Sequence, residues 1–301
     1  IGSQSLRWVV SKLNHSSLGL HTSAPIFARC QTSSSCAPKA CIARRAISIS
    51  IRGDPSRAPS LPMATATMRA SAWANTTPPG LPILQWRLGE QVYYPHEYGE
   101  VFTLGNARVS LHSAGHVLGS AQVRIEVDGE AWVASGDYKR QHDPTCAPFE
   151  VVPCDVFITE ATFGLPIYRW PDTGEVARDI VAWRDECAAR GETAILYCYA
   201  LGKAQRLLAE LAAHTDRPAF LHGAIETGTA IYREAGIPML ETRRIADEPR
   251  GSDFAGELVL APPSAAGSPW IRRFRHAQQG FASGWMRIRG NRRRRNYDRG
   301  F

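Results

Sequence analysis

The sequence predicts a layered α/β protein with two sheets, and three observations support this. From Ile83 onward, apolar strand-like runs and amphipathic helical runs follow one another with turn residues between them. The dipeptide Asp128-Gly129 separates two alternating runs and is typical of a hairpin turn. With 301 residues, 44% of them hydrophobic, the chain can bury a substantial core.

The first part of this pattern consists of short strands. We expect strands at residues 107–113, 122–127, 131–135 and 155–159. The second part alternates helix and strand. We expect helices at residues 175–190, 203–213 and 226–235, and strands at residues 193–197, 219–221 and 258–260. Repeated βα units of this kind predict a second, mostly parallel sheet inserted after the first one.

The net charge of +7 is unevenly distributed along the chain. Residues 1–80 carry nine Lys or Arg against Asp54, a balance of +8, and residues 285–301 carry seven Arg against Asp298, a balance of +6. The middle therefore has 7 − 8 − 6 = −7, so the total charge is no evidence for a nucleic-acid-binding surface. The seven cysteines form no CxxC pair, which favours reduced thiols in the cytoplasm, and no apolar run is long enough to predict a membrane helix.

Three candidate site residues each follow a predicted strand. His116, Asp137 and Glu160 would meet at one edge of a sheet, where imidazole and carboxylate groups commonly bind metals. From spacing alone, His116 and Asp137 are more readily explained as residues of ordinary Gly-flanked turns. A further candidate is the start of the helix at Lys203, where backbone N–H groups and a lysine would suit a phosphate, unless Lys203 is simply a solvated helix residue.

Seven segments resemble a known family. They are GHVLGSAQV, SGDYKR, DPTCAPFE, PCDVFITEATFGLP, YALGKAQR, LAPPSA and SGWMR, and they span about residues 95–290. Together they look like the bacterial ligase-associated DNA exonucleases, in the beta-CASP branch of the metallo-beta-lactamase superfamily, which are related to nucleases of DNA cross-link repair and RNA 3′-end processing. The resemblance implies a metallo-beta-lactamase αββα sandwich, incomplete here, with an inserted α/β beta-CASP domain.

The resemblance also implies roles for individual residues. His116 would be an imidazole ligand of the first metal, Asp137 a catalytic carboxylate bridging two metals, and Glu160 a catalytic acid beside them. Tyr199, Gly202 and Lys203 match a family motif that we expect to bind substrate. The implied cofactors are two divalent metal ions, zinc first and manganese or magnesium as alternatives, which would activate water and stabilise charge on the phosphodiester.

The sequence departs from this family at both ends. The family's HxHxDH signature is absent, and the chain stops at Phe301, before the family's Ser-Asp-His-Ala-Asp segment. Shifting the reading frame back by one nucleotide lets Met63, Thr65, Thr67 and Met68 become codons of the form NAT or NAC, which encode His, Tyr, Asn or Asp at the HxHxDH spacing. We therefore expect residues 1–80 to be out of frame and non-native or disordered, 81–170 to be a partial metallo-beta-lactamase core, 171–280 to be the beta-CASP insertion, and 281–301 to begin a truncated return to the core.

The sequence thus predicts a metal-dependent DNA exonuclease of DNA repair whose present chain holds its metals incompletely and is inactive. DNA is the expected substrate, with RNA as the alternative, and a DNA ligase and a helicase encoded nearby are the expected partners, without a membrane. A catalytically dead scaffold and an RNA-processing nuclease are the alternatives. A small-molecule metallo-hydrolase is disfavoured because an inserted domain suits a polymeric substrate better.

Overall fold

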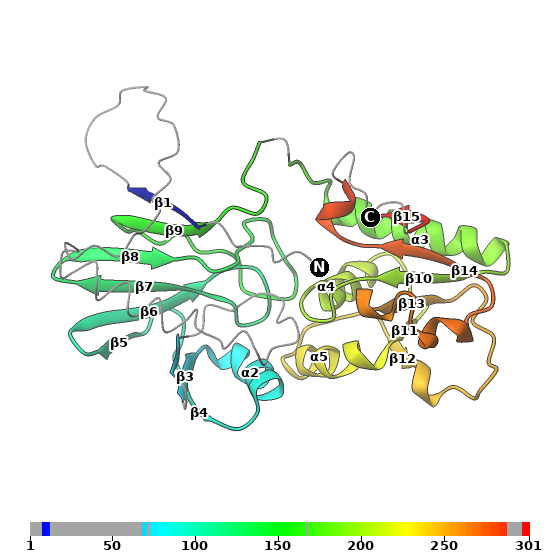
Figure 1. Cartoon of the computed structure of the whole chain (residues 1–301), viewed down its shortest axis with the longest axis horizontal. Coiled ribbons are helices and arrows are strands. Elements are labelled where there is room, and N and C mark those ends of the chain that lie inside the picture. Colours follow the sequence, from blue (N-terminus) through cyan, green and yellow to red (C-terminus); the bar gives the residue numbers. More distant parts are fainter. Residues whose placement is uncertain (1–7, 13–67, 71–72, 167, 288–296) are drawn as a thin grey trace. The chain divides into compact units, whose positions relative to one another are not determined.

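A computed structural model describes residues 8–12, 68–70, 73–166, 168–287 and 297–301 (Figure 1). The chain divides into two compact units, Ile1–Leu165 and Pro166–Phe301. Positions 63, 65 and 67, on which the frame hypothesis depends, lie outside the described residues. The frame hypothesis and the domain boundaries stay predictions.

The first unit is built on a six-stranded sheet in the order β1-β9-β8-β7-β6-β5. Its strands are β1 (Trp8–Lys12), β5 (Val101–Leu104), β6 (Ala107–Ser113), β7 (Ala121–Val127), β8 (Glu130–Ala134) and β9 (Val156–Glu160). All four strands expected in this region are confirmed to within one residue at each end. The hairpin between β7 and β8 turns at Asp128 and Gly129, both with positive φ, as the Asp-Gly pair predicted.

A second, three-stranded sheet also belongs to the first unit, in the order β2 (Met68–Ala70), β3 (Trp73–Thr76) and β4 (Val92–Pro95). The short 3-10 helix η1 (Pro78–Gly80) and the helix α2 (Leu81–Leu88) connect β3 to β4. None of these elements was predicted, nor was β5. The residues of β4 and β5 are largely exposed and show no alternation of apolar and polar side chains. Strands β1, β2 and β3 fall within residues 1–80, where no element was expected.

The second unit contains an all-parallel sheet in the order β12-β11-β13-β10-β14-β15. The strands are β10 (Thr193–Tyr197), β11 (Ala219–Leu221), β12 (Thr242–Arg244), β13 (Leu258–Ala261), β14 (Ala277–Phe281) and β15 (Arg299–Gly300). The predicted inserted parallel sheet is therefore confirmed. Together the two units give the expected mixed α/β fold.

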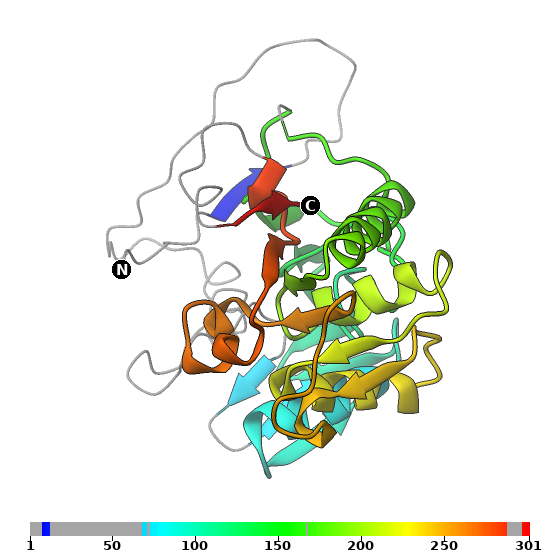
Figure 2. The same ribbon diagram turned by 90° about the vertical axis from the view of Figure 1, so that its right-hand side faces the viewer.

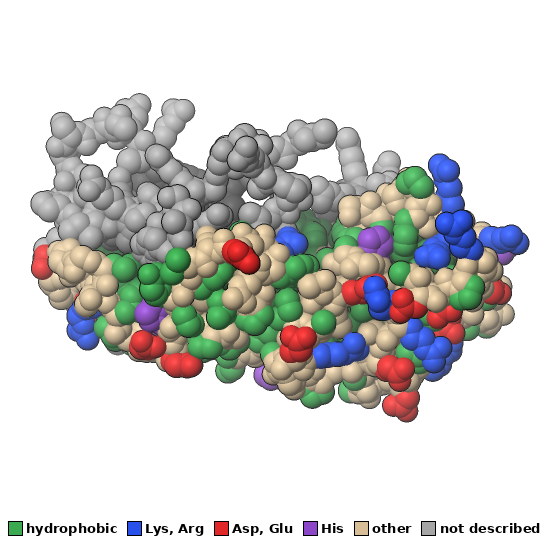
Figure 3. Space-filling view, turned by 90° about the horizontal axis from the view of Figure 1, so that it is seen from below, with side chains coloured by type: hydrophobic (Ala, Val, Ile, Leu, Met, Phe, Trp, Pro, Cys, Tyr) green, Lys and Arg blue, Asp and Glu red, His purple; other side chains and the backbone are tan. Residues whose placement is uncertain are grey.

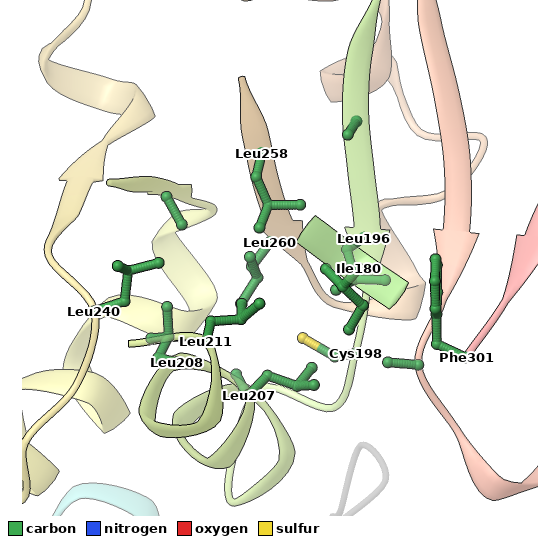
Figure 4. Packing of buried hydrophobic residues seen from close by; sticks show 14 of the residues in the cluster. Ile180, Leu196, Cys198, Leu207, Leu208, Leu211, Leu240, Leu258, Leu260 and Phe301 are labelled. Carbon is green, nitrogen blue, oxygen red and sulfur yellow. The ribbon is translucent and has the colours of Figure 1, made fainter. Parts of the chain in front are cut away.

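One face of this sheet is covered by three helices, α3 (Thr173–Ala189), α4 (Lys203–Leu211) and α5 (Gly223–Glu234). Leu207, Leu208 and Leu211 of α4 pack into the cluster that also holds Leu196 and Leu258 of the sheet (Figure 4). The long α3 buries Trp183 against Phe301, and Arg299 of β15 forms an ion pair with Glu186 of α3. Figure 2 shows α3 and β15 side by side.

The opposite face of the second sheet carries four 3-10 helices instead of long helices: η2 (Ile245–Asp247), η3 (Pro263–Ala265), η4 (Pro269–Arg273) and η5 (Gly284–Arg287). Their apolar side chains form a second buried cluster with Ile195, Tyr197 and Val259. Each strand of the middle of the sheet is thus buried on both faces, which explains the continuous apolar runs from which the strands were predicted.

Residues 281–301 were expected to begin a return to the first domain. This stays a prediction, and in the structure Arg299 and Gly300 pair with Gly280 and Phe281 as an edge strand of the second sheet. Strand β14 escaped prediction because it is mostly polar. Its Gln279 accepts a hydrogen bond from the Tyr197 hydroxyl at 3.0 Å, and its Gly280 leaves room for the Trp183 ring.

Candidate functional site: a carboxylate edge

Three strands of the first sheet run in the same direction and end at the same edge. Strand β6 is antiparallel to β7, β7 is antiparallel to β8, and β8 is parallel to β9. His116 and Asp137 lie in the segments that follow β6 and β8, and Glu160 is the last residue of β9. The expectation that these residues follow strands ending at one edge therefore agrees with the sheet topology.

Asp137 follows the end of β8. The backbone N–H of Ser135 donates to the Ile158 carbonyl, which is the last hydrogen bond between β8 and β9, and Gly136, with a φ of 58°, then leads to Asp137. Its Oδ2 atom is buried and has no hydrogen-bond partner among the described residues. Burial first, and the negative charge of Glu160 second, raise the pKa of Asp137 from 3.8 to about 6. A desolvated carboxylate oxygen of this kind favours a proton or a cation.

Glu160 is the last residue of β9 and is the second member of the carboxylate pair. The backbone N–H of Thr162 donates to its Oε2 atom at 2.7 Å, which fixes the carboxylate at the strand end. Since Glu160 acts electrostatically on Asp137, the structure brings these two predicted site residues together. We call Asp137 and Glu160 the carboxylate edge.

His116 lies in the loop between β6 and β7, whose backbone is tightly held. The Ser120 hydroxyl accepts hydrogen bonds from the backbone N–H groups of His116 and Val117 at 3.0 and 3.2 Å. The Thr77 hydroxyl donates to the carbonyl of Gly119, and the Tyr98 hydroxyl to that of Ser120. The motif GHVLGS is thus explained locally as a rigid loop closed by its own serine.

The His116 loop also packs against the segment that carries Asp137. The Lys139 backbone N–H donates to the carbonyl of Ala114 at 2.9 Å. Gly115 has a φ of 67°, and a Cβ atom added there would lie 2.4 Å from the Lys139 carbonyl oxygen, so only glycine fits. The two loops are therefore joined backbone to backbone.

A buried acid that sequence reasoning did not single out holds this second loop. Asp143, only 4% exposed, accepts hydrogen bonds from the backbone N–H and the hydroxyl of Thr145 at 3.0 and 2.6 Å. Lys139 forms an ion pair with Asp143 at 3.3 Å and donates to the carbonyl of His142. The pattern Asp-x-Thr, which is typical of an Asx turn, was the available signal in the sequence.

The described residues do not fit the two metals that the resemblance implies. Among them, no three His, Cys, Asp or Glu side chains form a group that could hold a metal ion. The orphaned Oδ2 of Asp137 and the neighbouring Glu160 supply oxygen donors suited to one divalent cation, but His116 does not complete a three-residue group with them. The imidazoles of an HxHxDH segment are the ligand type that this edge lacks.

The second predicted site, Tyr199, Gly202 and Lys203, lies where α4 begins. Gly202 takes a φ of 78° directly before the helix, and the Tyr199 side chain is 37% exposed, with its ring edge against Phe281 at 6.1 Å. The backbone N–H groups of Gly202, Lys203 and Ala204 all donate within the chain. A phosphate at this position would therefore depend on side chains rather than on these backbone donors.

Gln205 organises this turn and was not predicted. It is fully buried, its Oε1 accepts from the Gly202 N–H at 2.8 Å, and its Nε2 donates to the Ala200 carbonyl and to the Thr229 hydroxyl. A glutamine at the third helical position that reaches back to the N-cap backbone is half of a capping box, which is the signal that the sequence offered.

The fold and the carboxylate edge define the class of protein. It is a two-unit α/β protein with an acidic site at a sheet edge in the first unit and a parallel α/β sheet in the second.

Relatives with known names allow a narrower assignment. A probable DNA ligase of Opitutus terrae is 32% identical over 182 residues, which cover 59% of this chain and 17% of the relative. An RNase J-like protein of Methanocaldococcus jannaschii is 29% identical over 135 residues, covering 42% of this chain and 32% of the relative.

The cleavage and polyadenylation specificity factor 73 of Drosophila melanogaster is 34% identical over 115 residues, covering 38% of this chain and 16% of that protein. These relatives are metallo-beta-lactamase proteins of the beta-CASP branch, which agrees with the resemblance that the sequence motifs showed. The chain spans a third or less of the length of each of them. Some of the relatives carry nuclease names, such as the RNase J-like protein and an endoribonuclease of Gibberella zeae.

No protein-family model matches the chain. A solved structure of a protein of unknown function from Enterococcus faecalis superposes with a TM-score of 0.44 at 12% identity, over 69% of this chain and 56% of that one. Within the described part of the chain, none of the helices has the length and apolar character needed to cross a membrane.

Proposed function

We propose that the chain derives from a metal-dependent phosphodiester hydrolase, a DNA exonuclease of DNA repair, and that in its present form it does not hydrolyse nucleic acid. The carboxylate edge is the observation that supports the hydrolase. There, a buried Asp137 oxygen without a hydrogen-bond partner among the described residues lies beside a second acid, Glu160, and some of the relatives carry nuclease names. Acidic oxygens held on rigid loops are suited to position a cation or to accept a proton from water.

DNA rather than RNA is proposed because of the relative named as a probable DNA ligase, which is 32% identical over 59% of this chain. The proposal includes a DNA ligase and a helicase encoded nearby as partners, and the cytoplasm as the location. An RNA-processing nuclease is the second candidate, and it is supported by the names of the RNase J-like and endoribonuclease relatives.

The inactivity of this chain is proposed from its donor set. Two carboxylates without a third clustered ligand among the described residues cannot hold a pair of metal ions. A scaffold without catalysis would have the same donor set, and the gene distinguishes the two. Resequencing codons 35–85 should reveal HGHGDH continuous with the downstream frame if the chain is a damaged copy of an enzyme. An N-terminus that is in frame as written would support the scaffold.

The direct test uses the purified chain with 5′-labelled and 3′-labelled DNA and RNA strands of one sequence, in zinc, manganese or magnesium. We expect no cleavage above the level with a chelator. The protein translated from the corrected frame, extended by the downstream coding sequence, should shorten DNA progressively from one end, and its Asp137→Asn variant should not. Metal-dependent cleavage by the present chain, abolished by Asp137→Asn, would refute the inactivity. Cleavage of RNA alone by the corrected protein would favour the second candidate.

A further inference from the structure

The second unit contains a basic segment without acidic neighbours in the sequence. No Asp or Glu occurs between Glu257 and Asp298, while arginines stand at positions 272, 273, 275, 287, 289 and 292–295. Elsewhere in this unit, arginines such as Arg190, Arg217 and Arg244 form ion pairs with nearby acids. Figure 3 shows the same mixing, with several Lys and Arg side chains beside Asp and Glu over the second unit.

Within this segment, residues 270–275 form what we call the η4 strip, which includes most of η4. Phe274 is buried, and its ring contacts those of Trp270 and Phe254 at centroid distances of 4.9 and 5.2 Å. Trp270 and Ile271 are partly buried against the same cluster. These three apolar anchors fix the backbone of the strip on the face of the sheet opposite α3, α4 and α5.

The remaining positions of the strip are three exposed arginines, Arg272, Arg273 and Arg275. Among the described residues none of the three has a carboxylate partner within ion-pair distance, and Arg273 lies over the Phe254 ring at 5.9 Å. Three guanidinium groups held near one another without neutralising acids repel each other, so an anionic partner would relieve that repulsion.

We propose that the η4 strip binds the sugar-phosphate backbone of a single nucleic-acid strand, outside the carboxylate edge; this rests on the proposed function, because it takes nucleic acid as the substrate. Guanidinium groups suit phosphate through paired N–H donors. Arg272, Arg273 and Arg275 lie within four consecutive residues, so their guanidinium groups can reach neighbouring phosphates of one strand.

An aromatic neighbour favours a single strand over a duplex. Trp270 remains partly accessible at one end of the strip, and its ring meets that of His222 edge-on at 4.8 Å. Sites for single strands combine basic side chains that follow the backbone with aromatic rings on which unpaired bases stack. In a duplex the bases are already stacked on each other, so Trp270 would contribute less.

The test is an equilibrium titration of the full chain with a fluorescein-labelled 15-nucleotide thymidine strand, followed by anisotropy from 50 to 200 mM salt in the presence of a chelator. The triple variant Arg272→Ala, Arg273→Ala, Arg275→Ala removes three charges from the strip. The matched control, Arg87→Ala, Arg178→Ala, Arg243→Ala, removes three exposed arginines that also lack a described ion pair. Circular dichroism compares the folding of both variants with that of the parent chain.

We expect a shallower salt dependence for the strip variant. The slope of log affinity against log salt should become less negative by about 2, since each phosphate contact to a single strand contributes about 0.7. Trp270→Ala should weaken binding of the single strand more than binding of a hairpin duplex. No binding by the parent chain, equal losses in the strip and control variants, or equal affinity for a polyglutamate of the same charge would overturn the proposal. Hydrolysis is absent by design in this assay, so its outcome is independent of whether the corrected protein is a nuclease.

Discussion

Replacing Asp137 by Asn should stabilise the folded chain at neutral pH. The carboxylate is partly buried, and one of its oxygens has no partner, so its negative charge is poorly solvated in the folded state. The pKa rises from 3.8 to about 6 on folding. The folded state therefore binds more protons than the unfolded state between these two values, and the stability falls as the pH rises through that window.

The size of the effect follows from the shift. A difference of 6 − 3.8 = 2.2 in pKa corresponds to at most about 3 kcal/mol. Because the group is partly exposed and screened by solvent, we expect about 1–2 kcal/mol at pH 7.5. Asn has nearly the shape of the protonated acid and carries no charge, so the variant should escape this penalty.

The assay is urea unfolding of the chain and of the Asp137→Asn variant in a metal-free buffer, followed by tryptophan fluorescence, at pH 7.5 and pH 4.5. The advantage of the variant should fall to about a third at pH 4.5. Asp172→Asn, at an exposed helix N-cap that Asn also satisfies, should change little at either pH. A variant that is less stable than the parent at pH 7.5, or whose advantage does not shrink at pH 4.5, would refute the electrostatic account of the carboxylate edge.

Three further substitutions test the packing around the two sites, each by urea unfolding. Gly115→Ala should lower the free energy of unfolding by about 3 kcal/mol or more, since it adds a clash with the Lys139 carbonyl to the strain of a positive φ. Gly129→Ala, at a glycine with the same sign of φ but open space around it, should lower it by about 1 kcal/mol. Equal losses would contradict the joined-loop geometry. Gln205→Leu should cost about 2–4 kcal/mol, because it leaves the Gly202 N–H and the Ala200 carbonyl unpaired, and a neutral result would mean that water replaces the amide. Leu208→Ala in the core of the second unit should lower the free energy of unfolding by about 2–5 kcal/mol. Leu165→Ala, at an exposed position, should lower it by less than about 0.5 kcal/mol. Similar losses for both variants would contradict the packing in Figure 4.

The comparison of sequence and structure is clearest in the strands. Strands β10 and β13 were predictable because their side chains are all buried, so each appears in the sequence as an apolar run, and β6 was predictable because its sequence alternates apolar and polar residues. Strand β14 has the same neighbours but a polar sequence. Its glutamines are stabilised by the Tyr197 hydroxyl and Glu192, which lie more than 80 residues away in the chain.

The sequence by itself predicted the α/β class and the inserted parallel sheet, because apolar periodicity and turn residues are local properties. It also identified Asp137 and Glu160 as neighbours through the resemblance. Only the tertiary structure decided that one Asp137 oxygen is buried without a partner, that Asp143 and Gln205 hold the two loops, and that three arginines of the η4 strip lack acidic partners among the described residues. Burial, solvation and charge pairing depend on contacts between distant residues, and those contacts exist only once the chain is folded.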